Sequence, residues 1–268
     1  MRFSRVLRIF TAILLIATIC GSDAMLNADE KGLPILLYHH LIPERDMMFY
    51  KENGLVISEE LFDKHMKYLF DNGYHTATVA ELRDYLFNGK SLPDKSVMIT
   101  FDDGYMSNYI FAYPILKKYD FNAVLFTITA CLQTQDQIYH TNKLDMMSWI
   151  QIAASTDVFE TGSHTDNMHN ASKNGKTALM EASPELAEQD IALSLKRVSN
   201  SKIFAYPMGQ YNQSILDILK RHGVEMGFTT RGGYVTRVSD AMQLKRITIF
   251  SDCDIVRFAD YVSAKKRF

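Results

Sequence analysis

Several residue types are scarce in this chain, and each scarcity argues against a class of protein. Among its 268 residues are three cysteines and one tryptophan, and the formal net charge is −2. Three cysteines are too few for the disulfide framework of a small secreted domain. A nearly neutral chain gives no electrostatic reason to expect a nucleic-acid partner. No His-Glu-x-x-His segment occurs, so the sequence does not indicate a zinc peptidase of that type.

Long apolar runs are also missing, except near the N-terminus. Three arginines within the first eight residues precede an apolar run from Phe10 to Cys20, and Ser22 and Ala24 follow at the spacing that a signal peptidase accepts. The run is shorter than the roughly 20 residues that span a membrane. We therefore expect a signal peptide over residues 1–24, with an uncleaved anchor as the alternative, and a polar leader over 25–33. In either case we expect an extracytoplasmic protein that touches a membrane only if its N-terminal segment is retained.

The two cysteines beyond the predicted signal are Cys131 and Cys253. Two cysteines do not make a disulfide scaffold, so we expect two buried free thiols. A single bridge between them stays open from the sequence.

From residue 34 onward, short apolar segments alternate with amphipathic ones. Predicted helices begin after Ser58 and at a capping box that starts with Thr78. The alternation favours a mostly parallel sheet covered by helices, and six to eight such units favour a (β/α) barrel over an open sheet. No linker or repeat interrupts residues 34–268, which we take as one α/β domain. The predicted strands are 34–39, 96–101, 123–129, 158–163, 202–206, 224–229 and 245–250, and further helices are predicted at 108–118, 149–154, from 184, at 214–222 and from about 252.

Two adjacent carboxylates end the predicted strand at 96–101. Asp102 and Asp103 follow its apolar residues directly and precede Gly104. Neighbouring carboxylates repel each other, and a bound cation would remove that conflict while giving the two acids different roles. A turn in which Asp-Gly merely caps a loop is the alternative.

Two histidines follow the strand at 158–163 in the same way. His164 and His169 are five residues apart, at the start of the longest predicted loop, residues 165–182. Two imidazoles and one carboxylate make a three-ligand metal site with open positions for water and substrate. Because loops after barrel strands gather on one rim, we expect these histidines beside the aspartates. Two unrelated surface histidines are the alternative.

The strand at 202–206 runs into Pro207 and Gly209, which suit a backbone turned so that an N–H points into a cleft. Taken together, the segments 100–105, 163–169 and 204–209 resemble the polysaccharide deacetylase family, which shares the NodB homology domain. The resemblance covers about residues 34–250. It implies a distorted (β/α) barrel, with residues 34–268 as the catalytic domain. It also implies a hydrolase that removes acetyl groups from N-acetylglucosamine-containing glycans or, in some branches, from xylan.

Position by position, the resemblance implies that Asp103, His164 and His169 bind a divalent metal and that Asp102 is the general base. Zinc is the expected ion, with cobalt, manganese or nickel as alternatives. The expected partner is an N-acetylated polysaccharide or oligosaccharide of a cell wall or exopolysaccharide. A backbone N–H near Met208 is expected to face the tetrahedral oxyanion.

Two positions depart from the family pattern. Many members have an arginine in the third motif, where this chain has Ala205, and a terminal Leu-x-His that supplies the general acid. The matching stretch here is Leu244-Lys245-Arg246. Arginine is effectively always protonated, so Arg246 could stabilise charge but is a poor proton shuttle.

A branch resembling the poly-N-acetylglucosamine and peptidoglycan deacetylases offers another source of the acid. That branch has a first strand ending in Tyr-His, like Tyr38-His39 here, and takes its general-acid histidine from there. We therefore assign His39 as general acid, on the strand face that it shares with Ile35 and Leu37. Packing of His39 at the rim is the alternative, and His40 is expected to point elsewhere.

Two aromatic residues are candidates for contact with a sugar ring. They are Trp149, the only tryptophan, and Tyr206, and for both a core position is the alternative. Two other functions also stay open. One is a carbohydrate-binding relative without turnover, which the departures at Ala205 and Arg246 motivate, and the other is an O-acetyl esterase of the xylan type. Retention of Asp102 beside the metal ligands argues against a pure binder.

Overall fold

The computed structural model describes residues 32–265 and Phe268. The predicted signal peptide and nearly all of the polar leader lie outside the described residues. From Leu33 to Phe268 the chain forms one compact unit. Within the described part of the chain, no helix is long and apolar enough to cross a membrane.

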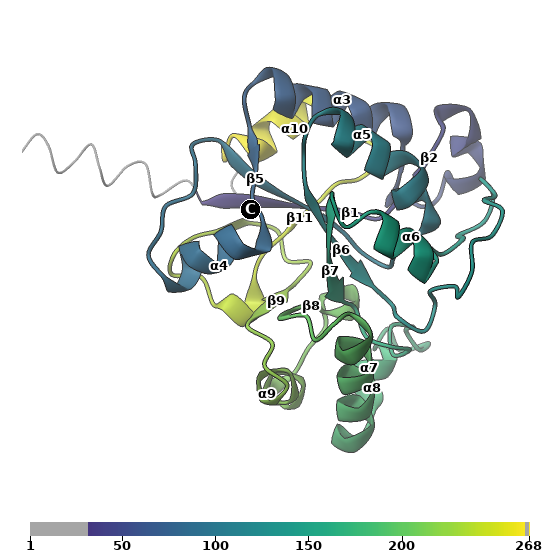
Figure 1. Cartoon of the computed structure of the whole chain (residues 1–268), viewed down its shortest axis with the longest axis vertical. Coiled ribbons are helices and arrows are strands. Elements are labelled where there is room, and N and C mark those ends of the chain that lie inside the picture. The colour runs from purple at the N-terminus through teal and green to yellow at the C-terminus, as the bar shows by residue number, and fades with distance from the viewer. Residues whose placement is uncertain (1–31, 266–267) are drawn as a thin grey trace, which may run out of the picture. The chain divides into compact units, whose positions relative to one another are not determined.

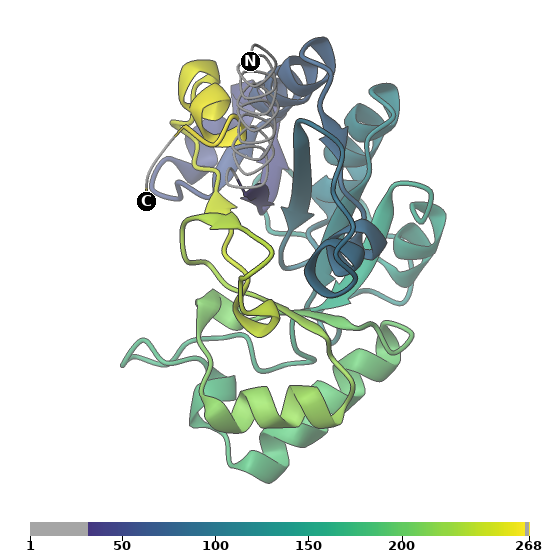
Figure 2. The ribbon, with the colours of Figure 1, turned by 90° about the vertical axis from the view of Figure 1, so that its left-hand side faces the viewer.

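Seven parallel strands among the described residues form the predicted barrel (Figures 1 and 2). β11 pairs in parallel with β1, and a single parallel bridge between Phe228 and Leu244 joins the end of β9 to the segment that leads into β11. The sheet therefore curls back on itself, with weak pairing at the point of closure. In spatial order from this closure the strands are β11 (Ile247–Thr248), β1 (Leu33–Tyr38), β5 (Ser96–Phe101), β6 (Ala123–Thr127), β7 (Phe159–Ser163), β8 (Ile203–Ala205) and β9 (Met226–Phe228).

Several two- or three-residue strands and short helical turns surround this barrel. The sequence did not predict them, because such short elements have no periodic pattern of apolar residues. β10 pairs antiparallel with β1, β4 pairs with β5, and β2 and β3 form a separate two-stranded sheet. These elements are β2 (His40–Ile42), β3 (Val56–Ser58), β4 (His75–Thr76), β10 (Tyr234–Val235), η1 (Glu44–Tyr50), η3 (Pro207–Gly209) and η4 (Ala241–Gln243).

The helices surround the strands, with α3, α5 and α10 on one side and α8 and α9 on another (Figure 1). Ser58 caps α3 by accepting from the Leu61 N–H, and Thr78 with Glu81 forms the expected capping box of α4. The helix predicted at 108–118 is a π-helix, η2 (Asn108–Ala112), that continues into α5. The helices are α3 (Glu59–Asp71), α4 (Val79–Phe87), α5 (Tyr113–Lys118), α6 (Trp149–Ala154), α7 (Ala178–Glu181), α8 (Pro184–Arg197), α9 (Gln213–Arg221) and α10 (Ile255–Val262).

Strand alternation separates the barrel interior from the layer between sheet and helices. On β1, Ile35 packs in an inner cluster with Met98 and Phe126, whereas the neighbouring Leu36 packs in an outer cluster with Phe101. A third cluster fills the space between β8, α8 and α9. The inner face of each strand therefore ends at the rim from which the predicted site residues project.

Two expectations about the rest of the chain need correction. The longest described stretch without a regular strand or helix is 128–148, between β6 and α6, not 165–182, because the latter contains α7. Cys131 and Cys253 are both free, but only Cys253 is fully buried.

Candidate active site

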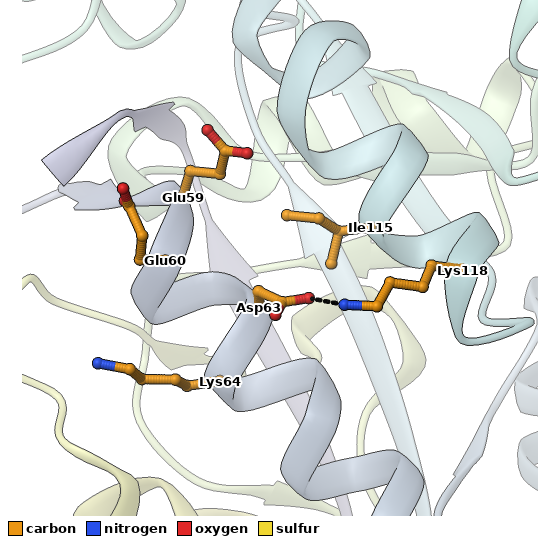
Figure 3. A pocket seen from close by; sticks show the side chains of 6 residues that line it. All are labelled: Glu59, Glu60, Asp63, Lys64, Ile115 and Lys118. Carbon is orange, nitrogen blue, oxygen red and sulfur yellow. Dashed lines mark hydrogen bonds and ion pairs between the residues drawn. The ribbon is translucent and has the colours of Figure 1, made fainter.

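A surface pocket of about 440 Å³ lies between α3 and α5, away from the predicted site residues (Figure 3). Three carboxylates and two lysines line it, and the Oδ1 of Asp63 pairs with the Nζ of Lys118 at 2.9 Å. Solvent-exposed ion pairs of this kind are common on helix surfaces and contribute little to stability. The chemistry lies instead at the rim formed by the strand ends.

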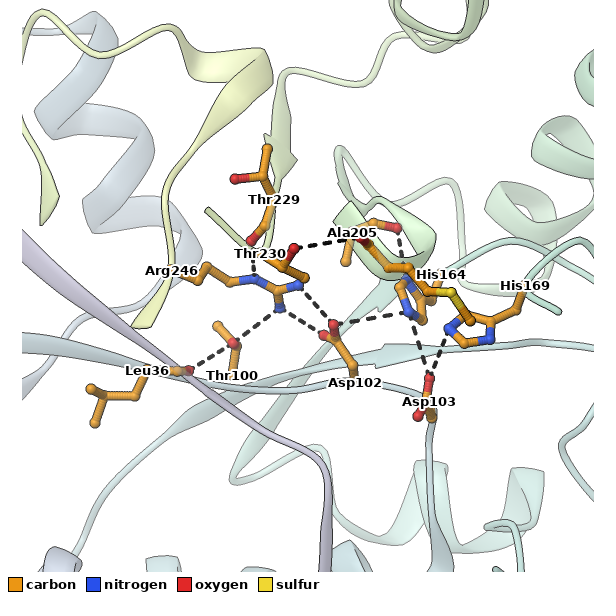
Figure 4. A network of polar contacts seen from close by, with 11 residues as sticks. Leu36, Thr100, Asp102, Asp103, His164, His169, Ala205, Thr229, Thr230 and Arg246 are labelled. Atoms are coloured by element: carbon orange, nitrogen blue, oxygen red, sulfur yellow. Dashed lines mark hydrogen bonds and ion pairs between the residues drawn. The ribbon is translucent and has the colours of Figure 1, made fainter. Parts of the chain in front are cut away.

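β5 delivers both aspartates to the rim but directs them differently. Strand alternation places Asp102 on the inner side, after Met98 and Thr100. Asp103 has φ of 74° and Gly104 has φ of 86°, both in the left-handed region. A left-handed non-glycine residue is strained and persists only where its surroundings hold it. Here the turn aims the Asp103 carboxylate at the histidines that follow β7 (Figure 4).

The three residues predicted to bind metal come together. The Oδ1 of Asp103 lies 3.6 Å from the Nε2 of His164 and 3.3 Å from the Nε2 of His169. One potential ligand atom from each residue lies within 4.8 Å of the others. Asp103 and His164 are buried, and His169 is partly exposed. The alternative of two unrelated surface histidines is therefore wrong.

The chemistry of these side chains fits a divalent cation. The Nδ1–H of His164 donates to the Ala205 carbonyl at 2.7 Å, which leaves the Nε2 lone pair facing Asp103. Burial lowers the pKa of His164 to about 4 against the opposing pull of Asp102, so the imidazole is neutral at pH 7. The Oδ1 of Asp103 is buried without a hydrogen-bond partner among the described residues. Neutral imidazoles and an unpaired carboxylate oxygen are the ligands that zinc and related ions take.

Arg246 lies directly beside Asp102. Its guanidinium is fully buried and donates from Nη1 and Nη2 to the two carboxylate oxygens of Asp102, each at 2.7 Å (Figure 4). It also donates to the Thr229 carbonyl at 2.9 Å and to the Thr100 hydroxyl at 3.2 Å. This chain therefore has an arginine beside Asp102, in the segment before β11, although none stands at position 205. The sequence held a clue to this position, because Arg246 stands two residues after Leu244, which faces the barrel interior. In an extended segment, residues two apart point to the same side.

This pairing controls the protonation of Asp102. Burial by itself would raise the pKa of the carboxyl, but the guanidinium of Arg246, helped by His164 and His39, outweighs burial and holds that pKa at about 2. Asp102 is therefore ionised at neutral pH. A carboxylate offers about four lone-pair sites, and a bidentate arginine uses two of them, so Asp102 keeps capacity to accept from a water.

The two histidines after β1 face different surroundings, as alternation predicts. His40 is buried, its Nδ1 lies 2.9 Å from the Ser107 hydroxyl, and its ring packs edge-on against Tyr105. His39 is only partly buried, and its charge influences Asp102. Its Nδ1 is buried without a hydrogen-bond partner among the described residues. His39 therefore lies near Asp102 at the rim, and its role as general acid stays a prediction.

The predicted substrate contacts fare unequally. Met208 is about half exposed and has φ of 52° in the turn that follows β8, and the direction of its N–H stays a prediction. Tyr206 is fully buried, and its hydroxyl donates to the Met242 carbonyl at 2.7 Å. Trp149 opens α6 and packs partly against the outer core cluster. Tyr206 is therefore a core residue in this structure and does not line the rim, which corrects the expectation of a sugar contact.

Comparison with known sequences gives consistent matches over most of the chain. A family model described as polysaccharide deacetylase matches residues 89–227. The poly-β-1,6-N-acetyl-D-glucosamine N-deacetylase of Staphylococcus aureus is 34% identical over 203 residues, which cover 73% of this chain and 68% of that protein. YxkH of Bacillus subtilis, named as a candidate polysaccharide deacetylase, is 32% identical over 239 residues, covering 87% of this chain and 77% of that protein.

Solved structures show the same likeness. IcaB from Ammonifex degensii is 29% identical, with a TM-score of 0.72 over 87% of this chain and 97% of that chain. The Streptococcus pyogenes deacetylase PplD in complex with acetate is 26% identical, with a TM-score of 0.73 over 86% of this chain and 98% of that chain.

Proposed function

Since this chain belongs to the polysaccharide deacetylase family, we propose that it hydrolyses the N-acetyl groups of an N-acetylglucosamine-containing glycan with a bound divalent metal. The observation that carries the proposal is the convergence of Asp103, His164 and His169 next to an ionised Asp102. A single rim would thus combine a metal-binding donor set with a base, which is the minimum set for metal-assisted hydrolysis of an amide.

A poly-β-1,6-linked N-acetylglucosamine is the first substrate to test. The support is the 34% identity to an enzyme named for that glycan, over 73% of this chain. The predicted signal over residues 1–24 would deliver the protein to such a glycan outside the cytoplasm. Peptidoglycan fragments present the same acetamide and are the second choice.

Asp103, His164 and His169 would hold the metal, for which zinc is the expected ion. When bound, the cation would polarise the acetyl carbonyl and lower the pKa of the attacking water. His164 is oriented for this role by its hydrogen bond to the Ala205 carbonyl. The exposed fraction of the His169 side chain, 20%, marks the side of the site that faces solvent.

Proton transfer falls to side chains on two neighbouring strands. Asp102 would accept the proton of the attacking water, and Arg246 keeps its carboxylate ionised and fixed in orientation. His39 would return a proton to the leaving sugar amine, because it lies near Asp102 and is partly exposed. The turned backbone at Met208 would face the developing oxyanion.

The position of Arg246 weakens the alternative of a binder without turnover. That alternative was motivated by the absence of an arginine at Ala205, yet the buried guanidinium of Arg246, from the segment before β11, pairs with the carboxylate proposed as the base. A protein that only binds sugar gains nothing from an ionised carboxylate fixed beside a metal site. An O-acetyl esterase of the xylan type would instead release acetate from acetylated xylan and not from N-acetylated amino sugars.

Acetate release by the purified protein tests the proposal. The substrates are poly-β-1,6-N-acetylglucosamine oligomers, peptidoglycan fragments and acetylated xylan, each with added zinc and with a chelator. The variants are Asp103→Ala and, as a matched control, Asp217→Ala on the exposed face of α9. We expect zinc-dependent release from the amino sugars that Asp103→Ala abolishes and Asp217→Ala retains. Release from xylan alone, or none from folded zinc-loaded protein, would refute the proposal.

A further inference from the structure

We infer that Asp190 on α8 is a positioning residue for the metal site, because its carboxylate holds the turn that brings His169 back onto Asp103. The inference rests on the proposed metal-dependent function. Asp190 lies outside the motifs of the sequence analysis and does not belong to the three-residue metal cluster. Its role follows from the hydrogen bonds that hold the segment between His164 and His169.

The first fastening is made by backbone groups. The Oδ1 of Asp190 accepts from the Asp166 N–H and its Oδ2 from the Asn167 N–H, both at 2.8 Å. Two consecutive N–H groups thus converge on one carboxylate. The turn that aims them begins at Thr165, whose φ of 75° lies in the left-handed region. A strained turn of this kind needs contacts that hold it, and the carboxylate supplies them.

The second fastening is made by the side chain of Asp166. Its Oδ1 accepts from the Nη1 of Arg197 at 2.5 Å and from the Thr129 hydroxyl at 2.6 Å. Arg197 follows Asp190 by about two turns of α8, so both side chains project from the same helix face. Thr129 belongs to the rim segment after β6. The first half of the histidine loop is therefore tied to a rigid helix and to a neighbouring strand end.

The second half of the loop is tied to α7. The carbonyls of Met168 and Asn170, on either side of His169, accept from the Leu179 and Ala178 N–H groups at 3.1 and 2.8 Å. Both ends of the arc that carries His169 are thus fixed. Without the Asp190 contacts the first half would keep its ties at Thr165 and Asp166 to the segment after β6 and to Arg197, but the Asn167 N–H would lose its acceptor. The path from Asp166 to His169 would then be less fixed, and with it the approach of His169 to Asp103.

The chemical identity of residue 190 matters because both carboxylate oxygens are used. Asp190 is buried, and burial raises the pKa of its carboxyl while the two N–H donors act against that rise. An asparagine has the same shape but only one acceptor oxygen. Its amide NH₂ would then face a backbone N–H. Asp190→Asn is therefore the variant that disturbs the turn with the least change in volume.

The test compares zinc binding with folding. Zinc dissociation constants would be measured by competition with a chelating dye for the wild type, Asp190→Asn and the control Glu185→Gln, which changes an exposed carboxylate on the same helix. Thermal unfolding of each metal-free protein would report its stability. We expect Asp190→Asn to weaken zinc binding by about 10- to 100-fold, the usual effect of losing a group that orients a metal ligand. We also expect Glu185→Gln to match the wild type.

A merely structural role would lower the unfolding temperature of the metal-free variant and leave zinc affinity within twofold of the wild type, which would overturn the inference. If Asp190→Asn does not fold, Arg197→Gln releases Asp166 from a partly exposed position and should still weaken zinc several-fold. An unchanged zinc affinity in that variant would likewise reject the inference. Wild-type protein that binds no zinc would instead refute the proposed function, so the two failures are distinguishable.

Discussion

Replacing Arg246 with methionine should destabilise the protein more than almost any other single change. The side chains of Arg246 and Asp102 are 0% and 3% exposed, and methionine keeps most of the apolar stem of arginine without its charge. The change leaves a buried carboxylate without a counter-charge and removes donors from the Thr229 carbonyl and the Thr100 hydroxyl. Removing one partner of a buried ion pair costs about 3–5 kcal/mol. Against a typical total stability of about 5–15 kcal/mol, that loss is large.

The pH dependence gives the prediction a sign. In the wild type the pKa of Asp102 is about 2, below its unfolded value of about 3.9, so the pair stabilises fully above the unfolded pKa and its contribution is lost as pH falls toward 2. Without Arg246, burial raises the pKa of Asp102, and protonation then relieves the unpaired charge. The difference in stability between wild type and Arg246→Met should therefore shrink on acidification.

Urea unfolding of the metal-free proteins at pH 7 and at pH 4.5 measures this effect. The double variant Arg246→Met with Asp102→Asn should recover part of the loss, because it removes the stranded charge. Arg257→Met serves as control, since its pair with Asp252 is solvent-exposed and contributes little to stability. A cost below about 1 kcal/mol for Arg246→Met at pH 7, or the same cost whether or not Asp102 is present, would refute the reasoning.

Three further predictions concern single residues. His39→Asn should lower acetate release by about 10²- to 10⁴-fold while zinc affinity stays within twofold, and unchanged turnover would reject His39 as the general acid. Burial lowers the pKa of His65, which lies 2.9 Å from the Cys253 carbonyl, to about 4. The free energy of unfolding should therefore fall by about 3 kcal/mol as pH falls from about 6.5 to 4, because the unfolded chain takes up a proton at His65 that the folded protein does not. Urea unfolding across this pH range measures the fall, and an equally steep fall in His65→Gln would contradict the prediction. At Gly104, with φ of 86°, an added Cβ would lie 3.1 Å from the Thr127 Cγ2, so urea unfolding of Gly104→Ala should show a loss of about 1–3 kcal/mol, and wild-type stability would count against strain at this turn.

Local patterns carried much of what the sequence determined. Apolar runs and capping residues are short-range features, so the strands at 96–101 and 158–163 and the helices after Ser58 and Thr78 were predicted close to their observed bounds. The convergence of Asp103, His164 and His169 was also predicted, because these residues belong to two compact motifs at strand ends. Alternation along β1 was enough to distinguish His39 from His40.

Long-range packing decided the rest. Arg246 meets Asp102 across 144 residues of chain, and Asp190 meets Asp166 across 24. Neither pair has a periodic signature, because their contact depends on barrel closure next to β1 and on where α8 packs. The burial of Tyr206 could not be predicted from the sequence either, because an aromatic residue at a strand end has the same sequence context whether it faces a cleft or the core. The sequence by itself determined the elements and the residues with local motifs, whereas the tertiary structure alone decided which buried charges pair and which side chains reach the rim.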